Sequence, residues 1–218
     1  YCTSDLHQGS HSHQIDGKNV YFHGRKIIED VFKQLDSEFK SAGELIFAGY
    51  SAGAIGLGFN ADLIKKYKNP KLIVDSFWLD KESRRVRKGW TKGPWPEINK
   101  FLYSSMPRHC KGHWSACFPQ RTKFKSMKIK HVFPIWNIGD PYIKGDMNKV
   151  RKSIENDIQF YDAGFSIDAK KFRVEGFEKW GHVITIDKHY TKKIDGVSVK
   201  MLIENWLSDQ GQTTLVKH

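Results

Sequence analysis

Short apolar runs alternate along this chain with longer segments whose apolar residues recur at helical spacing. Four runs have the length of buried strands, at residues 45–48, 72–74, 132–136 and 172–174. Four longer segments have the pattern of helices, at residues 24–40, 52–66, 147–162 and 196–207. Strands that alternate with helices favour a parallel sheet covered by helices. We therefore predict an α/β fold with a mostly parallel sheet flanked by helices.

The length of 218 residues is enough for a single large domain with its own core. The stretch 76–130 is richer in Pro, Trp and charge, and we predict an insertion or cap over the sheet there, with a short helix at 96–104. Pro134 inside the third apolar run indicates an edge strand or a bulge. No apolar run approaches the roughly 20 residues that span a membrane.

Residues 49–53, Gly-Tyr-Ser-Ala-Gly, lie between a predicted strand and a predicted helix. This is the context in which a Gly-x-Ser-x-Gly turn presents a serine nucleophile at the edge of a sheet. The small neighbours of Ser51 allow the tight turn, and the helix that begins at Ala52 directs free N–H groups toward the reaction centre. We predict Ser51 as the nucleophile and the Ala52 N–H as an oxyanion donor. The alternatives are a glycine-rich turn without chemistry and a phosphate-binding loop.

Chain order narrows the choice of partners for Ser51, because such hydrolases place the acid and then the histidine after the serine. Asp140 follows the third apolar run and is the predicted acid, with Asp146 as its rival; Asp75 is less well placed. His182 follows the last predicted strand and is the predicted base, with His189 as its rival. A serine, a base and an orienting acid are what acyl transfer requires.

The remaining histidines and the cysteines allow simpler interpretations. His7, His11 and His13 are predicted to lie in an exposed loop rather than to bind a metal, because no carboxylate or thiol completes a ligand set. The three cysteines are Cys2, Cys110 and Cys117. A short disulfide loop between the last two is feasible, and three reduced thiols are the alternative. We predict neither a metal nor another cofactor.

The chain is basic, with 36 Lys and Arg against 24 Asp and Glu and a formal net charge of +12. Such a charge attracts polyanions. The densest basic patch, at residues 84–88, is weak support for nucleic acid, which we do not expect as a partner. A sulfated or acidic glycan suits the charge equally well.

An ordered set of motifs resembles the pectin acetylesterase and Notum family of α/β-hydrolases. The motifs are Tyr-Cys-Thr-Ser-Asp at 1–5, Tyr-Phe-His-Gly-Arg at 21–25, Ala-Gly-Tyr-Ser-Ala-Gly at 48–53, Val-Asp-Ser at 74–76, Trp-Leu-Asp at 78–80 and Cys-Phe-Pro-Gln at 117–120. They follow the family's order over nearly the whole chain. Pro119 departs from the pattern, since Notum has an aromatic residue there.

The resemblance implies a secreted carboxylesterase with Ser51, Asp140 and His182 as its triad. It also implies a disulfide between Cys110 and Cys117, and it makes Trp78 and Phe118 candidates for an apolar pocket wall. Family members carry an upstream Gly-Gly-Trp segment that supplies further oxyanion donors. The sequence given begins after such a segment, so we expect an N-terminally truncated fragment.

The family's two branches differ in substrate. One removes acetyl groups from pectin, and the other removes a palmitoleoyl group from Wnt proteins and binds sulfated glycosaminoglycans. The resemblance therefore implies a serine carboxylesterase that removes an O-acyl group, from acetyl to fatty acyl, from a polysaccharide or a lipidated protein through an acyl-enzyme. The alternative is a non-catalytic protein that binds polyanions on an esterase scaffold.

Overall fold

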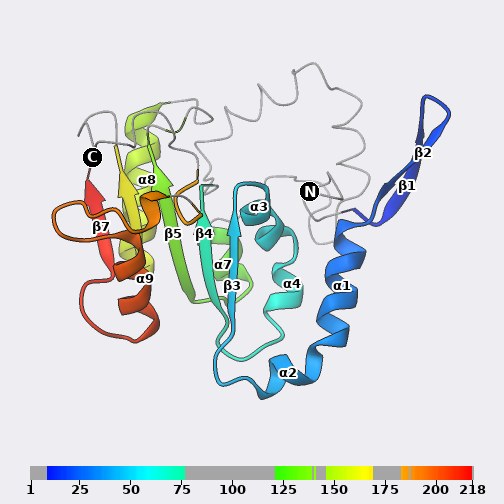
Figure 1. Cartoon of the computed structure of the whole chain (residues 1–218), viewed down its shortest axis with the longest axis horizontal. Coiled ribbons are helices and arrows are strands. Elements are labelled where there is room, and N and C mark those ends of the chain that lie inside the picture. The colour runs from blue at the N-terminus through cyan, green and yellow to red at the C-terminus, as the bar shows by residue number, and fades with distance from the viewer. Residues whose placement is uncertain are drawn as a thin grey trace.

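The computed structural model describes residues 9–76, 121–138, 140, 146–168, 183–186 and 188–217. At its centre is a five-stranded sheet in the order β3-β4-β5-β6-β7, in which every neighbouring pair is parallel (Figure 1). The strands are β3 (Ile46–Tyr50), β4 (Lys71–Asp75), β5 (His131–Asn137), β6 (Gly164–Ile167) and β7 (Thr214–Lys217). The apolar runs at 45–48, 72–74 and 132–136 form β3, β4 and β5, as predicted.

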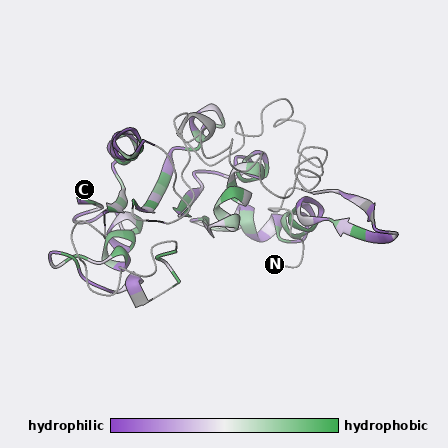
Figure 2. Ribbon diagram, turned by 90° about the horizontal axis from the view of Figure 1, so that it is seen from above, coloured by the Kyte–Doolittle hydropathy of each residue, from purple (hydrophilic) through white to green (hydrophobic). Residues whose placement is uncertain are grey.

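Helices cover both faces of the sheet (Figure 2). Side chains of α3 (Ala52–Phe59), α7 (Arg121–Ser126) and α8 (Met147–Tyr161) share one buried cluster with Val132 and Trp136 of β5. Side chains of α9 (Val199–Leu207) share a second cluster with Phe133 and Ile135 of the same strand. Successive residues of a strand point to opposite faces, so β5 is buried on both sides. The predicted architecture of a parallel sheet flanked by helices is confirmed.

The prediction that Pro134 marks an edge strand or a bulge is wrong, because β5 pairs with β4 on one side and with β6 on the other. Pro134 pairs with Val74 of β4, whereas the register with β6 begins only at Ile135. A proline without an N–H donor is tolerated here because the pairing with β6 starts after it. Gly164 has φ 134°, and a Cβ at this residue would lie 2.8 Å from the Pro134 carbonyl oxygen. Glycine therefore allows β6 to begin beside the proline.

The segment predicted as one helix at 24–40 forms two, α1 (Gly24–Gln34) and α2 (Asp36–Ser41), which meet at Leu35. The break turns Phe39 toward a group of aromatic side chains, those of Phe32, Phe47 and Tyr67. The ring centroids of Phe39 and Tyr67 are 5.4 Å apart and their planes are nearly perpendicular, a favourable geometry for aromatic pairs. The spacing of apolar residues predicts one continuous helix here, and the observed break accompanies the packing of Phe39 against these rings.

The segment 52–66 also forms two helices, α3 and α4 (Ala61–Ile64), with Asn60 between them. Arg25 of α1 binds at this break: its Nη1 donates to the Phe59 carbonyl oxygen and to Asn60 Oδ1, each at 3.2 Å. Its guanidinium also binds the Asp62 carboxylate through two bonds of 2.8 Å. Because Arg25 takes a carbonyl that a continuing helix would use, it fixes α1 against the end of α3.

The last two predicted helices are present. The segment 147–162 forms α8, and 196–207 forms α9, which begins only at Val199 because Ser198 caps it by accepting a hydrogen bond from the Met201 N–H at 3.2 Å. Val199, Leu202, Ile203 and Trp206 are the buried residues of α9. They are the apolar face that the spacing predicts.

The N-terminal part of the described chain is a β-hairpin of β1 (His11–Ile15) and β2 (Lys18–Phe22), which extends away from the sheet (Figure 1). Asp16 and Gly17 form its turn with φ of 49° and 73°. The prediction of an exposed loop is therefore wrong for His11 and His13, which lie in a paired strand. His7 lies outside the described residues.

The predicted helix at 96–104, the strand at 172–174 and the basic patch at 84–88 also lie outside the described residues, as do residues 77–120 of the predicted insertion. Its last ten residues belong to the main fold, since Phe124 of α7 and Ile129 are buried in the core cluster beside α3. Among the helices that the structure describes, none is long and apolar enough to cross a membrane.

Candidate active site

Three candidate residues lie at one edge of the sheet. Ser51 follows β3, Asp75 ends β4, and Asp140 lies three residues beyond β5. The carboxyl ends of parallel strands meet at the same edge, where α/β proteins bind their ligands. The fold therefore brings together the predicted nucleophile, the predicted acid and an aspartate that the sequence ranked lower.

Ser51 lies on a strained turn between β3 and α3. Its backbone has φ 49° and ψ −119°, a conformation that a non-glycine residue adopts at a cost of about 1–3 kcal/mol. Its N–H donates to the Asp75 carbonyl oxygen at 2.9 Å, and its own carbonyl accepts from the Ile55 N–H at 3.2 Å. The strand–turn–helix context predicted for Ser51 is present, and strain of this kind is typical of functional positions.

The two glycines that flank Ser51 have different roles. A Cβ at Gly49 would lie 2.5 Å from the Gly53 carbonyl oxygen and 2.8 Å from the Ala54 nitrogen, both backbone atoms. A Cβ at Gly53 would meet no described atom within 4 Å. The tight turn therefore requires glycine at position 49, where the first turn of α3 packs against the end of β3, and has no steric requirement for it at position 53.

Ala52 is the first residue of α3, and it is partly exposed. The N–H groups of a helix's first turn have no partner within the helix, and the helix dipole adds positive potential there. Ala52 is thus placed as the prediction of an oxyanion donor requires. Its role stays a prediction.

Asp140 is 4% exposed, and its N–H donates to the Asn137 carbonyl oxygen at 3.0 Å. Its rival Asp146 is exposed and caps α8, accepting hydrogen bonds from the Asn148 N–H at 3.1 Å and the Lys149 N–H at 3.4 Å. A side chain engaged as a helix cap is less available to orient a histidine. The geometry therefore favours Asp140 over Asp146, and its catalytic role stays a prediction.

His182, the predicted base, lies outside the described residues. So do Trp78 and Phe118, the predicted pocket walls, and the predicted disulfide partners Cys110 and Cys117. The rival base His189 is described: it is fully buried in a short 3-10 helix, Lys188–Tyr190. The chain beyond His182 is described again from Val183, and it returns directly to the edge of the sheet that carries Ser51.

At this edge Ile184 and Thr185 bind the side chain of Asp75, which is 1% exposed. Its Oδ2 accepts hydrogen bonds from the Ile184 N–H at 2.8 Å, the Thr185 N–H at 2.7 Å and the Thr185 hydroxyl at 2.8 Å. Its Oδ1 accepts from the Ser76 hydroxyl at 2.5 Å. Burial raises the pKa of the Asp75 carboxyl, and these hydrogen bonds oppose that shift.

Three of the four hydrogen bonds meet on Oδ2 and one is on Oδ1, so the Asp75 carboxylate is already engaged by its neighbours, and Asp140 stays the predicted acid of the triad. Sequence reasoning ranked Asp75 below Asp140 but did not predict its contacts. The only sequence signal is a carboxylate at the end of a buried strand.

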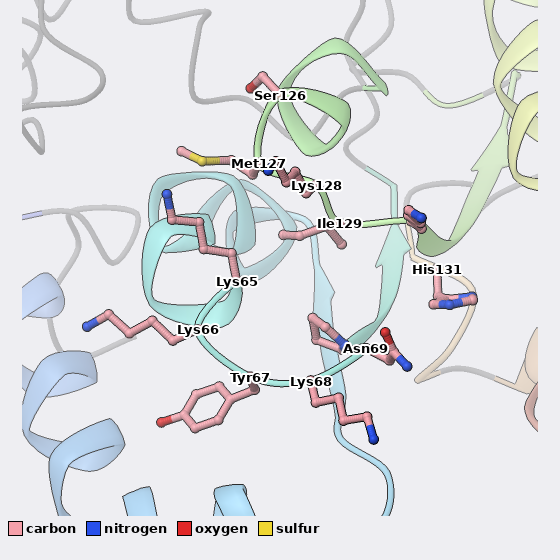
Figure 3. A pocket seen from close by; sticks show the side chains of 12 residues that line it. Lys65, Lys66, Tyr67, Lys68, Asn69, Ser126, Met127, Lys128, Ile129 and His131 are labelled. Atoms are coloured by element: carbon pink, nitrogen blue, oxygen red, sulfur yellow. The ribbon is translucent and has the colours of Figure 1, made fainter.

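A second feature is a cavity of about 550 Å³ at the opposite edge of the sheet, before β4 and β5. Its lining includes five lysines, Lys65, Lys66, Lys68, Lys128 and Lys130, together with His131, and no acidic residue. These side chains are exposed, and Lys65, Lys66 and Lys68 point in different directions (Figure 3). The result is a broad basic surface rather than a set of groups that converge on one point.

Known proteins resemble this chain in both sequence and structure. Residues 1–93 match the family model of pectinacetylesterases. The palmitoleoyl-protein carboxylesterase NOTUM of Schmidtea mediterranea is 39% identical in an alignment of 89 residues that covers 36% of this chain and 16% of that protein. Two crystal forms of the Wnt deacylase Notum from Drosophila align with TM-scores of 0.60 and 0.57 at 19% identity, covering 99% and 96% of this chain and 69% and 66% of theirs.

The structural matches define an α/β-hydrolase fold, and at this identity they show the fold alone. The chain is related to the pectin acetylesterase and Notum proteins, as its motifs predict; the match to the family model covers its first 93 residues.

Proposed function

We propose that this chain hydrolyses carboxylic esters through an acyl-enzyme formed on Ser51. The observation that carries the proposal is the strained Ser51 turn at the carboxyl end of β3, with the amino end of α3 directly after it. The names of the relatives support it, since a palmitoleoyl-protein carboxylesterase, a Wnt deacylase and a pectinacetylesterase all cleave acyl groups.

In the proposed reaction the Ser51 hydroxyl oxygen attacks the acyl carbonyl carbon while His182 takes its proton. Asp140 orients the imidazole, and the Ala52 N–H stabilises the oxyanion of the tetrahedral intermediate. Collapse of the intermediate releases the alcohol, which receives the proton from His182. Water, deprotonated by His182, then attacks the acyl-enzyme, and the acid leaves as Ser51 is restored.

The proposed substrate is an O-acyl group, from acetyl to fatty acyl, on a polysaccharide or a lipidated protein. Trp78 and Phe118 are proposed as apolar walls for the acyl chain, and the protein is proposed to be secreted, with Cys110 and Cys117 paired. These assignments rest on the family resemblance and on the names of the relatives.

Covalent labelling tests the mechanism directly. A fluorophosphonate probe reacts with a serine whose hydroxyl is activated by a neighbouring base. We expect the full-length protein to form one adduct, located by peptide mass spectrometry on Ser51. A folded full-length protein that gives no adduct at Ser51 overturns the proposal and favours a binding protein on an esterase scaffold.

We further propose that the lysine-lined cavity binds a linear acidic glycan. None of its five lysines makes an ion pair with another residue that the structure describes, and no acidic residue lines the cavity. The spread of the side chains suits a chain with repeated charges better than a single phosphate or sulfate. The cavity lies at the edge opposite Ser51, so a glycan held there leaves the proposed esterase site open.

Replacing the cavity lysines by glutamine should weaken binding to heparin. The variant carries Lys65→Gln, Lys68→Gln, Lys128→Gln and Lys130→Gln. Because each cation that meets a ligand anion releases a counterion, the slope of log K against log salt should fall by roughly 0.7–0.9 for each contacting lysine. Elution from heparin at lower salt and a shallower slope are the expected results.

A matched control removes the same charge elsewhere, with Lys26→Gln, Lys33→Gln, Lys152→Gln and Lys193→Gln, all of them exposed. If binding depends only on net charge, the two variants weaken it equally. Equal weakening in both variants contradicts a glycan site at the cavity.

A further inference from the structure

We infer that Asp75 is a positioning residue of the proposed ester-hydrolysis site, and that it ties the chain segment directly after His182 to the strand end beside Ser51. The inference rests on the proposed function, in which His182 is the base. Asp75 is not one of the proposed triad residues Ser51, Asp140 and His182. Every contact that supports the inference joins two residues that the structure describes.

Asp75 contacts both sides of the site. Its backbone carbonyl accepts the Ser51 N–H at 2.9 Å, and its carboxylate accepts the Ile184 and Thr185 N–H groups at 2.8 and 2.7 Å. The two partners of this single residue are separated by more than 130 positions of sequence. The nucleophile turn and the segment after the base are therefore held by the same residue at the end of β4.

Ile184 is held in a second way. Its side chain is fully buried in the core cluster that contains Phe133 and Ile135 of β5. Ile184 follows the proposed base His182 by two positions in the sequence, so the contacts that fix Ile184 act on the chain directly after the base. The Asp75 carboxylate and the core cluster together fix the start of the described segment that follows the base.

The hydrogen bonds that hold Ile184 and Thr185 depend on the negative charge of the Asp75 carboxylate. Three donors meet on Oδ2, and hydrogen bonds to an ionised acceptor are about twice as strong as neutral ones. An asparagine can direct its oxygen to the same donors and its amide to the Ser76 hydroxyl, so it keeps the geometry with weaker bonds. An alanine removes the acceptor and leaves two backbone N–H groups without it.

The experiment measures kcat and KM of the full-length protein on p-nitrophenyl acetate for Asp75→Ala, Asp75→Asn and Thr185→Val. A misplacement of ~1 Å can cost about 100-fold in rate, so we expect kcat to fall about 100-fold in Asp75→Ala and by less in Asp75→Asn, with KM little changed. Thr185→Val removes one donor and keeps the side-chain shape, so it should fold even if Asp75→Ala does not, and its loss of kcat should be the smallest.

Two readouts separate positioning from general stability. Asp157 is a buried carboxylate in the second half of α8, on the stretch of chain that leads to the start of β6 at Gly164, and Asp157→Asn should lower the thermal midpoint while leaving kcat unchanged. If Thr185 acts through Asp75, the two substitutions are not additive, and Thr185→Val has little further effect on kcat in an Asp75→Ala or Asp75→Asn background. Hydrogen exchange at the Ile184 and Thr185 amides should also be faster in Asp75→Asn.

The outcomes distinguish the two proposals. Unchanged kcat in Asp75→Asn and Thr185→Val, in a protein that still labels on Ser51, overturns the positioning role and leaves the esterase proposal intact. A wild-type protein that neither labels nor hydrolyses ester overturns the esterase proposal and the positioning role with it. A reduced kcat with non-additive substitutions and faster exchange supports both.

Discussion

Ser51→Ala is expected to lower kcat on p-nitrophenyl acetate and octanoate by about a thousand-fold or more, the scale of loss when a nucleophilic serine is removed. Without the hydroxyl no acyl-enzyme can form, and only the oxyanion donor and substrate binding remain. Alanine keeps a Cβ at the strained backbone of position 51, so the turn and α3 should persist. Steady-state kinetics on both esters, with circular dichroism to verify the fold, measure the effect.

Ser76 provides the control for this experiment. It is the serine next to the end of β4, and its hydroxyl already donates to Asp75. Ser76→Ala should therefore keep the fluorophosphonate adduct on Ser51, whereas Ser51→Ala should lose labelling altogether. Hydrolysis of both esters at the wild-type rate by Ser51→Ala shows that another residue is the nucleophile.

Local sequence patterns were sufficient to predict the strands and helices that position Ser51. The strands before and after the turn, the helix that follows it and the buried face of α9 are all set by short-range apolar spacing, which is readable from one sequence. The parallel arrangement of the sheet followed from the alternation of strands and helices. These features fixed which edge of the sheet carries Ser51 and Asp140.

The features that the sequence did not predict depend on contacts between residues far apart in the chain. Arg25 binds the Phe59 carbonyl at the end of α3 from another helix, and no local pattern near Phe59 indicates that contact. Pro134 lies in a central strand because the pairing with β6 starts one residue later. Asp75 binds residues 109 and 110 positions away, so its sequence neighbourhood shows only a strand end. Each case depends on a partner that only the tertiary structure brings near.

Gly49→Ala should also lower activity strongly, for a steric reason. The added Cβ would lie 2.5 Å from the Gly53 carbonyl oxygen and 2.6 Å from its carbonyl carbon, and neither backbone atom can rotate away. The first turn of α3 must shift from the end of β3, which moves Ser51 and the Ala52 N–H. A shift of ~1 Å can cost about 100-fold in rate, and overpacking of this kind destabilises by about 1–3 kcal/mol. Enzyme kinetics and chemical denaturation measure the two effects.

Gly53→Ala is the matched control, since it makes the same substitution in the same motif, four residues later. Its Cβ meets no described atom within 4 Å, and alanine favours a helix over glycine by about 1 kcal/mol. We therefore expect unchanged or slightly higher stability and near wild-type kcat for Gly53→Ala. Equal losses in both variants would mean that the motif needs glycine for backbone freedom in general. A loss confined to Gly49→Ala would mean that the nucleophile is positioned by the close contact between β3 and the first turn of α3.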